Sequence, residues 1–112
     1  MIKKIKGISE IIYKYDAFIL DQWGVMHDGT NGYEHAIEAV KLLKKHKKEI
    51  IIISNSSKRK QSSINRLPHL GFDKNNFVEV LTSGEMIWQQ IFLSLDSYGK
   101  ELKNCFHIYN KS

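Results

Sequence analysis

The chain has 112 residues, 42% of them hydrophobic, which is enough for the core of one small domain and argues against wholesale disorder. Seventeen basic and twelve acidic residues give a formal net charge of +5. The basic excess is diffuse apart from one lysine cluster: Lys41, Lys44, Lys45, Lys47 and Lys48. No aromatic residues are interleaved with this cluster, so we interpret it as a solvated helix face and expect no nucleic-acid partner.

The beginning of the chain carries no targeting pattern. Lysines stand at positions 3, 4, 6 and 14 and acids at 10 and 16, and no apolar stretch approaches the roughly 20 residues of a membrane span. Cys105 is the only cysteine, which excludes an intramolecular disulfide. We therefore expect a soluble, cytoplasmic protein without a membrane partner, in which Cys105 is a small buried hydrophobe.

The first half of the chain alternates between helical and strand patterns. Residues 8–15 have apolar side chains at helical spacing and predict a short amphipathic helix. Residues 17–21 predict a strand short enough to be buried on both faces of a parallel sheet. Residues 22–32 contain three glycines and predict an irregular loop. Residues 33–48 predict a helix with lysines in its last turn, and residues 49–54, with four consecutive isoleucines, predict a second strand.

The second half continues this alternation. Residues 58–70 predict a helix whose final turn is disturbed by Pro68 and which stops at Gly71. Residues 77–82 predict a third strand, residues 85–98 a helix opened by Ser83 or Gly84, and residues 105–109 a weaker fourth strand. Strands separated by helices predict βαβ units and a parallel sheet.

Polar residues end the predicted strands, and parallel strands present such ends at the ligand-binding edge of the sheet. Asp21 ends the first strand and can be a nucleophile, a metal ligand or a structural cap of the following loop. The glycine-rich turn beside it offers backbone N–H groups to an anion. Ser54-Asn55 ends the second strand and suits donation to phosphate oxygens, with Ser56 and Ser57 opening a helix whose N-terminus favours the same anion; the alternative is ordinary N-capping by either serine.

Three segments together resemble a known family. They are Asp21-Gln22-Trp23-Gly24-Val25-Met26-His27-Asp28-Gly29, Ile53-Ser54-Asn55-Ser56-Ser57-Lys58-Arg59 and Leu81-Thr82-Ser83-Gly84-Glu85. In order and spacing they resemble the haloacid dehalogenase superfamily, in particular its subclass IIA, which includes nitrophenylphosphatase-like and sugar-phosphate-phosphatase-like hydrolases. The resemblance extends over about residues 8–109.

This resemblance implies an α/β fold: a partial Rossmann-like parallel sheet with flanking helices, truncated at the start of a cap domain. Residues 1–84 would form the N-terminal part of the core, and residues 85–112 the incomplete start of a C2-type cap. Intact relatives would be Mg²⁺-dependent phosphatases that act on small phosphate esters through an aspartyl-phosphate.

The resemblance also implies roles for single residues. Asp21 matches the nucleophile, which is also a Mg²⁺ ligand. Trp23 matches a position whose backbone carbonyl binds the metal and whose side chain is normally the aspartate that acts as general acid/base. Four residues match phosphate-binding positions: Gly24, Val25, Ser54 and Asn55.

Two departures from the family pattern bear on activity. An indole at Trp23 cannot transfer a proton as a carboxylic acid does, and loss of a general acid/base typically costs roughly 10²–10⁴-fold in rate. His27 and Asp28 are the candidate substitutes. The family also needs a motif-III lysine and motif-IV acids after the cap, and no residue up to Ser112 matches them. We therefore expect little or no phosphatase activity from this chain alone.

Two other interpretations stay open. In one, the chain is half of a split enzyme, and exposed apolar surface binds a C-terminal partner chain that completes the fold. In the other, it is a non-catalytic remnant or a basic binding module that uses the lysine cluster. The remaining histidines lack metal-ligand spacing and are interpreted as surface or hydrogen-bonded residues: His35, His46, His69 and His107.

Overall fold

The computed structural model describes residues 4–92, 106 and 108. Its centre is a parallel sheet of three strands in the order β1-β2-β3. The strands are β1 (Ala17–Leu20), β2 (Glu49–Ser54) and β3 (Glu79–Thr82). Phe18 is paired with Ile50, and Ile52 with Val80. This arrangement confirms the predicted α/β class and the parallel sheet.

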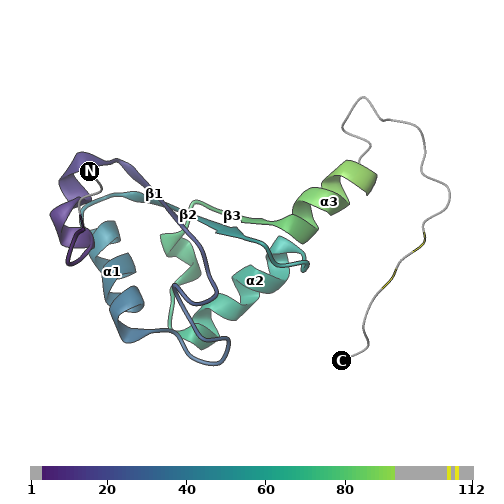
Figure 1. The fold of residues 1–112 in the computed structure, drawn as a ribbon, viewed down its shortest axis with the longest axis horizontal. Helices are drawn as coiled ribbons and strands as arrows, with labels where there is room; N and C mark the ends of the chain where they lie inside the picture. Colours follow the sequence, from purple (N-terminus) through teal and green to yellow (C-terminus); the bar gives the residue numbers. More distant parts are fainter. Residues whose placement is uncertain (1–3, 93–105, 107, 109–112) are drawn as a thin grey trace.

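Helices connect the strands and flank the sheet. They are α1 (Glu34–Lys45), α2 (Lys60–Arg66) and α3 (Ser83–Phe92). Helices α1 and α2 lie on the same side of the sheet, whereas α3 leads away from the end of β3 (Figure 1). Among the helices in the described residues, none has the length and apolar character needed to cross a membrane.

The core lies between the sheet and the two segments that contain α1 and α2. Phe18, Ile50, Ile52 and Val80 point toward it from the strands and are buried. Helix α1 contributes Val40 and Leu43, and the segment after α2 contributes Leu67, Leu70 and Phe72. Burial of each large apolar side chain is worth roughly 1.5–3 kcal/mol. This packing fixes the strand ends, and therefore the loops that follow them.

The opposite face of the sheet is open. Ile19 on β1 is 64% exposed and Ile53 on β2 is 45% exposed. The prediction that the first strand is buried on both faces is therefore wrong for the described residues. The physical reason is that α1 and α2 cover only one side of the sheet (Figure 1). Because the side chains of a strand alternate between the two faces, every second side chain stays on the uncovered face.

The segment before β1 also differs from its prediction. Residues 8–15 form two 3₁₀ turns, Ile8–Glu10 and Ile12–Lys14, and not one amphipathic α-helix. Ile11 separates them with φ −121°. So short a segment gains few hydrogen bonds against the cost of starting a helix, and tertiary burial of Ile12 decides its shape.

The effect of Pro68 is confirmed. Helix α2 passes at Leu67 into the 3₁₀ turn Leu67–Leu70, and Gly71 ends it with φ +86°. A short 3₁₀ turn, Lys74–Asn76, precedes β3. The last part of the predicted helix at 85–98, Cys105 and most of the predicted strand at 105–109 lie outside the described residues. Phe106 and Ile108 are described, belong to no strand and are exposed.

Candidate functional site

The ends of the strands meet at one edge of the sheet, as predicted. Asp21 directly follows β1, whose last residue Leu20 is paired with Ile52. Ser54 ends β2 and is paired with Thr82 at the end of β3. Two loops leave this edge: the first loop, residues 21–33, and the second loop, residues 54–59.

Asp21 presents an open carboxylate at this edge. Its Oδ1 accepts a hydrogen bond from the Gln22 N–H at 2.8 Å, and the residue is exposed. The other oxygen has no protein donor in the described part of the chain. An ionised carboxylate with a free oxygen is the form that acts as a nucleophile or binds a hard cation.

The first loop is held by its own hydrogen bonds. The Gln22 carbonyl accepts from the N–H groups of Met26 at 2.8 Å and of Val25 and His27 at 3.3 Å each. The Gly24 N–H donates to the His27 carbonyl at 2.9 Å, and Gly24 takes φ +74°. Gly24 and Val25, predicted to bind phosphate through their amides, thus lie beside Asp21 with both N–H groups engaged inside the loop.

Two other amides near this edge are available. Within the described residues, the N–H groups of Trp23 and Asn55 have no acceptor. They follow the ends of β1 and β2, and neighbouring strands of a sheet lie ≈ 4.7–4.9 Å apart. Free backbone donors of this kind hold anions in many proteins. The sequence alone did not distinguish them from Gly24 and Val25, because that distinction depends on how the loop closes on itself.

The second loop contains two tight serine turns. Ser54 is buried, and its Oγ accepts from the Ser56 N–H at 3.2 Å. The Ser56 Oγ accepts from the Lys58 N–H at 3.2 Å. Helix α2 begins only at Lys60, with no side-chain cap from its N-cap residue Arg59. The prediction that Ser56 and Ser57 start or cap this helix is therefore wrong, because the serine turns keep the chain out of helical conformation until Arg59.

The Glu85 side chain caps the N-terminus of α2 in place of the N-cap residue, a role that was not predicted from the sequence. Glu85 is 4% exposed; its carboxylate accepts from the Lys60 N–H at 3.1 Å and from Arg59 at 2.7 and 3.2 Å. These hydrogen bonds, with Arg59 first, hold the pKa of Glu85 below its usual value. Arg59 also lies 3.6 Å over the ring of Trp88. The first turn of α3 thereby binds the second loop.

Two further contacts fasten the second loop to α3. Thr82 Oγ1 donates to the Lys58 carbonyl at 2.7 Å and accepts from the Glu85 N–H at 3.1 Å. The Gly84 N–H donates to the Ser56 carbonyl at 3.0 Å. Thr82 and Glu85 have the spacing of a capping box, which is the signal that could have identified Glu85. A capping box would pair the Glu85 carboxylate with the Thr82 N–H, whereas it accepts from the Lys60 N–H.

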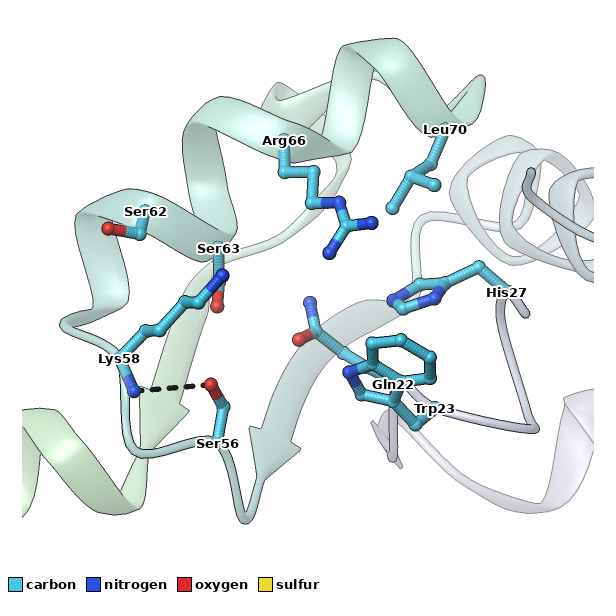
Figure 2. Close-up of a pocket in the computed structure, with 9 residues that line it drawn as sticks. All are labelled: Gln22, Trp23, His27, Ser56, Lys58, Ser62, Ser63, Arg66 and Leu70. Carbon is cyan, nitrogen blue, oxygen red and sulfur yellow. Dashed lines mark hydrogen bonds between the residues drawn. The ribbon is translucent and has the colours of Figure 1, made fainter. Parts of the chain in front are cut away.

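A small cavity lies between the two loops and α2 (Figure 2). Its volume is about 110 Å³. We call it the basic cavity; it is lined by Gln22, Trp23, His27, Ser56, Lys58, Ser62, Ser63, Arg66 and Leu70. Arg66 donates to the Gly29 carbonyl, and its guanidinium carbon lies 5.9 Å from the centre of the Trp23 ring. The cavity thus joins the first loop to α2.

His27 and Asp28, the candidate substitutes for the missing acid, are both engaged. His27 is buried, and its Nδ1 accepts from the Gly29 N–H at 3.0 Å. Burial, and next the positive charge of Arg66, lower the pKa of His27. The Asp28 carboxylate accepts from the N–H groups of Asn31 and Thr30 at 2.7 and 2.8 Å, and these bonds lower the pKa of Asp28. Both groups therefore favour their deprotonated forms, which are poor proton donors.

The donors available for a metal are oxygens. In the part of the chain that the structure describes, no group of three or more His, Cys, Asp or Glu side chains is placed to hold a metal ion. Asp21 offers a free carboxylate oxygen, and the Trp23 carbonyl accepts no hydrogen bond from any described residue. Trp23 as a whole residue is 53% exposed, and its indole ring lies edge-on to His27. These two oxygen donors are of the kind that Mg²⁺ prefers.

Comparison with known proteins agrees with this arrangement. No curated protein matches the chain. A solved structure described as a hydrolase of the haloacid dehalogenase-like family from Brucella suis 1330 has a TM-score of 0.68 and 29% identity. The match covers 75% of this chain and 31% of that chain, so this chain spans about a third of that relative's length. A family model of haloacid dehalogenase-like hydrolases matches residues 18–105, and the chain therefore belongs to this family.

Proposed function

We propose that this chain carries the nucleophile half of a Mg²⁺-dependent phosphatase of subclass IIA, which acts on small phosphate esters. The proposal rests on one observation: Asp21, with one unpaired carboxylate oxygen, and groups that can donate hydrogen bonds to phosphate lie at the same edge of the sheet. These donors are the Ser54 hydroxyl and the free N–H groups of Trp23 and Asn55. Gly24 and Val25 shape the turn that carries Trp23.

The proposed reaction has two displacements. The free oxygen of Asp21 attacks phosphorus, the bond from phosphorus to the ester oxygen breaks, and the leaving alcohol takes up a proton. Water then attacks the phosphorus of the aspartyl-phosphate, the P–O bond to Asp21 breaks, and inorganic phosphate leaves with the Asp21 carboxylate restored. Positioning and charge stabilisation supply most of the catalysis in phosphoryl transfer. Ser54 and the two amides serve this purpose by binding the non-reacting phosphate oxygens.

Asp21 and the Trp23 carbonyl would hold Mg²⁺, as two of its six oxygen ligands. When bound, the metal would neutralise negative charge on the phosphoryl group and on Asp21. The use of a backbone carbonyl explains how Trp23 can stand at this position without loss of a metal ligand, since any residue type supplies that oxygen.

The described residues at this site offer no good proton donor for the leaving alcohol. Trp23 cannot supply it, and His27 and Asp28 favour their deprotonated forms. We propose that the chain alone has little or no turnover, and that the missing acid, lysine and metal ligands lie on further polypeptide. In this proposal residues 85–112 begin a C2-type cap, and the open sheet face with Ile19 and Ile53 receives the remainder, either in the same protein or as a partner chain.

Two experiments test this proposal. Beryllium fluoride forms an acyl-phosphate mimic on a nucleophilic aspartate, and ¹⁹F NMR detects the bound species without turnover. We expect a Mg²⁺-dependent bound signal that disappears with EDTA or in Asp21→Asn and weakens in Ser54→Ala. A signal that persists in an Asp21→Asn variant with the same fold, or no signal from the folded unmodified chain, would refute Asp21 as the nucleophile.

The second experiment measures hydrolysis of an aryl phosphate with Mg²⁺. We expect turnover near background for the 112-residue chain. Clear turnover that vanishes in Asp21→Asn would contradict the dependence on further polypeptide, while leaving the nucleophile assignment intact.

A further inference from the structure

Three consecutive cationic residues, Lys58, Arg59 and Lys60, differ in their ion pairing. Arg59 forms an ion pair with Glu85 at 2.7 Å, and Lys60 forms one with Glu79 at 3.1 Å. Lys58 forms no ion pair with any acid in the described residues. Its side chain lines the basic cavity, where it extends toward Ser63 (Figure 2).

Several other residues that line the basic cavity can also donate hydrogen bonds. Arg66 points into it from α2, opposite the side-chain amide of Gln22 (Figure 2). Ser62 and Ser63 line it, and their hydroxyls have no hydrogen-bond partner among the described residues; the Ser63 hydroxyl faces the end of Lys58, whereas the Ser62 hydroxyl points away from it (Figure 2). No carboxylate is among the lining residues, so two positive charges face the cavity without a negative one. A cluster of cations and hydroxyls without acids is suited to an anion with several oxygens.

The size of the cavity agrees with a small oxyanion. Its volume of about 110 Å³ is several times the roughly 10–15 Å³ of cavity volume that one water needs, so it has room for an ion of several atoms. Neither Asp21 nor Ser54 lines it, so it is separate from the proposed nucleophile site, although Trp23 and Ser56 belong to the loops that carry that site.

We propose that the basic cavity is a second anion site that binds a phosphate group through the Lys58 ammonium and the Ser63 hydroxyl. Arg66, fixed on the Gly29 carbonyl, contributes its charge from the far wall. The phosphate group is either a free ion or a second anionic group on a ligand that also reaches the sheet edge. The site goes beyond the proposed phosphatase activity, because its occupancy requires neither Asp21 nor a metal.

The test is a titration of the ¹⁵N-labelled 112-residue chain with inorganic phosphate in EDTA, followed by amide chemical shifts. We expect saturable shifts at Ser62, Ser63 and the Gln22 side-chain amide. In Lys58→Met the affinity should fall about 10-fold, as expected for loss of one charge-assisted contact. Lys58→Arg should retain most of it. Absence of saturable shifts at these positions would overturn the proposal.

Matched variants separate a site from a general charge effect. Lys41→Met removes the same charge from the exposed face of α1 and should leave phosphate affinity unchanged. Equal weakening by Lys41→Met and Lys58→Met would overturn the proposal, because binding would then follow net charge alone.

A second pair of ligands identifies the source of the anion. Propane-1,3-diol bisphosphate and propyl phosphate are titrated in the same way. Tighter binding of the bisphosphate than of the monophosphate, lost in Lys58→Met, would assign the cavity to a second group of a larger ligand. Equal binding of inorganic phosphate and both esters, with the same Lys58 dependence, would assign it to free phosphate. Binding of either ester that is insensitive to Lys58→Met would contradict the site.

Discussion

The two loops at the edge of the sheet are stabilised in opposite ways. The first loop closes mainly on itself, through three hydrogen bonds to the Gln22 carbonyl and through the Asp28 carboxylate, with one long-range hydrogen bond from Arg66 to the Gly29 carbonyl. The second loop depends on residues more than twenty positions further along the chain, namely Thr82, Gly84 and Glu85. Asp21 is therefore placed by local structure, whereas the position of Ser54 and Asn55 depends on the start of α3.

The largest loss of folding stability is expected from Gly84→Ala, which disturbs the contact between α3 and the second loop. A Cβ at Gly84 would lie 2.0 Å from the Ser57 carbonyl oxygen and 2.7 Å from that of Lys58, so backbone must move. The clash should cost about 2–3 kcal/mol, against a helix-propensity gain of at most about 1 kcal/mol. We expect a net loss of about 2 kcal/mol in urea unfolding. A variant as stable as the wild type would mean that the second loop is not held rigidly by α3.

Glu85→Gln tests the same contact through pH. The pKa of Glu85 is lowered in the folded state, chiefly by its hydrogen bonds from Arg59, below its ordinary value of 4.5. A lowered folded-state pKa contributes stability above about pH 4.5, which is lost as the pH falls through the folded value. The wild type should therefore lose melting temperature on acidification, and Glu85→Gln should melt lower at pH 7 with a flatter profile below pH 4.5. Parallel profiles would contradict this role.

Gly24 and Gly29 of the first loop should tolerate substitution better than Gly84. Gly29→Ala places a Cβ 2.2 Å from the Trp23 ring at φ +98°, but this ring is exposed and can swing away. Gly24→Ala meets nothing within 4 Å and isolates the cost of a positive φ. We expect losses of about 1–2 kcal/mol for Gly29→Ala and about 1 kcal/mol for Gly24→Ala in urea unfolding. A larger loss than for Gly84→Ala would reverse the comparison.

The smallest effect concerns the contact between the first loop and α2. In Arg66→Met, the pKa of His27 should rise because a nearby positive charge is removed. It should remain below 6.5, since burial is the larger cause of its lowering. An NMR titration of the imidazole protons measures this change. A value that falls or stays constant would show that Arg66 does not act on His27 electrostatically.

Much of the fold could be predicted because its signals are local. The four isoleucines before Ser54 indicated β2 with its observed bounds, and Pro68 with Gly71 indicated where the helix after the second loop breaks and ends. The segment at 8–15 was mispredicted because its isoleucines show helical spacing, whereas burial of Ile12 selects two 3₁₀ turns. Spacing reports which residues are apolar, but not how tightly the chain turns.

The sequence by itself determined the α/β class, the parallel strands and the presence of Asp21 and Ser54 at strand ends, since apolar periodicity and glycine placement are properties of neighbouring residues. Only the tertiary structure decided which amides stay free, which acid caps α2 and which of three adjacent cations lacks a partner. The roles of Glu85 and Lys58 depend on contacts between segments distant in the chain, and no local pattern encodes where such side chains meet.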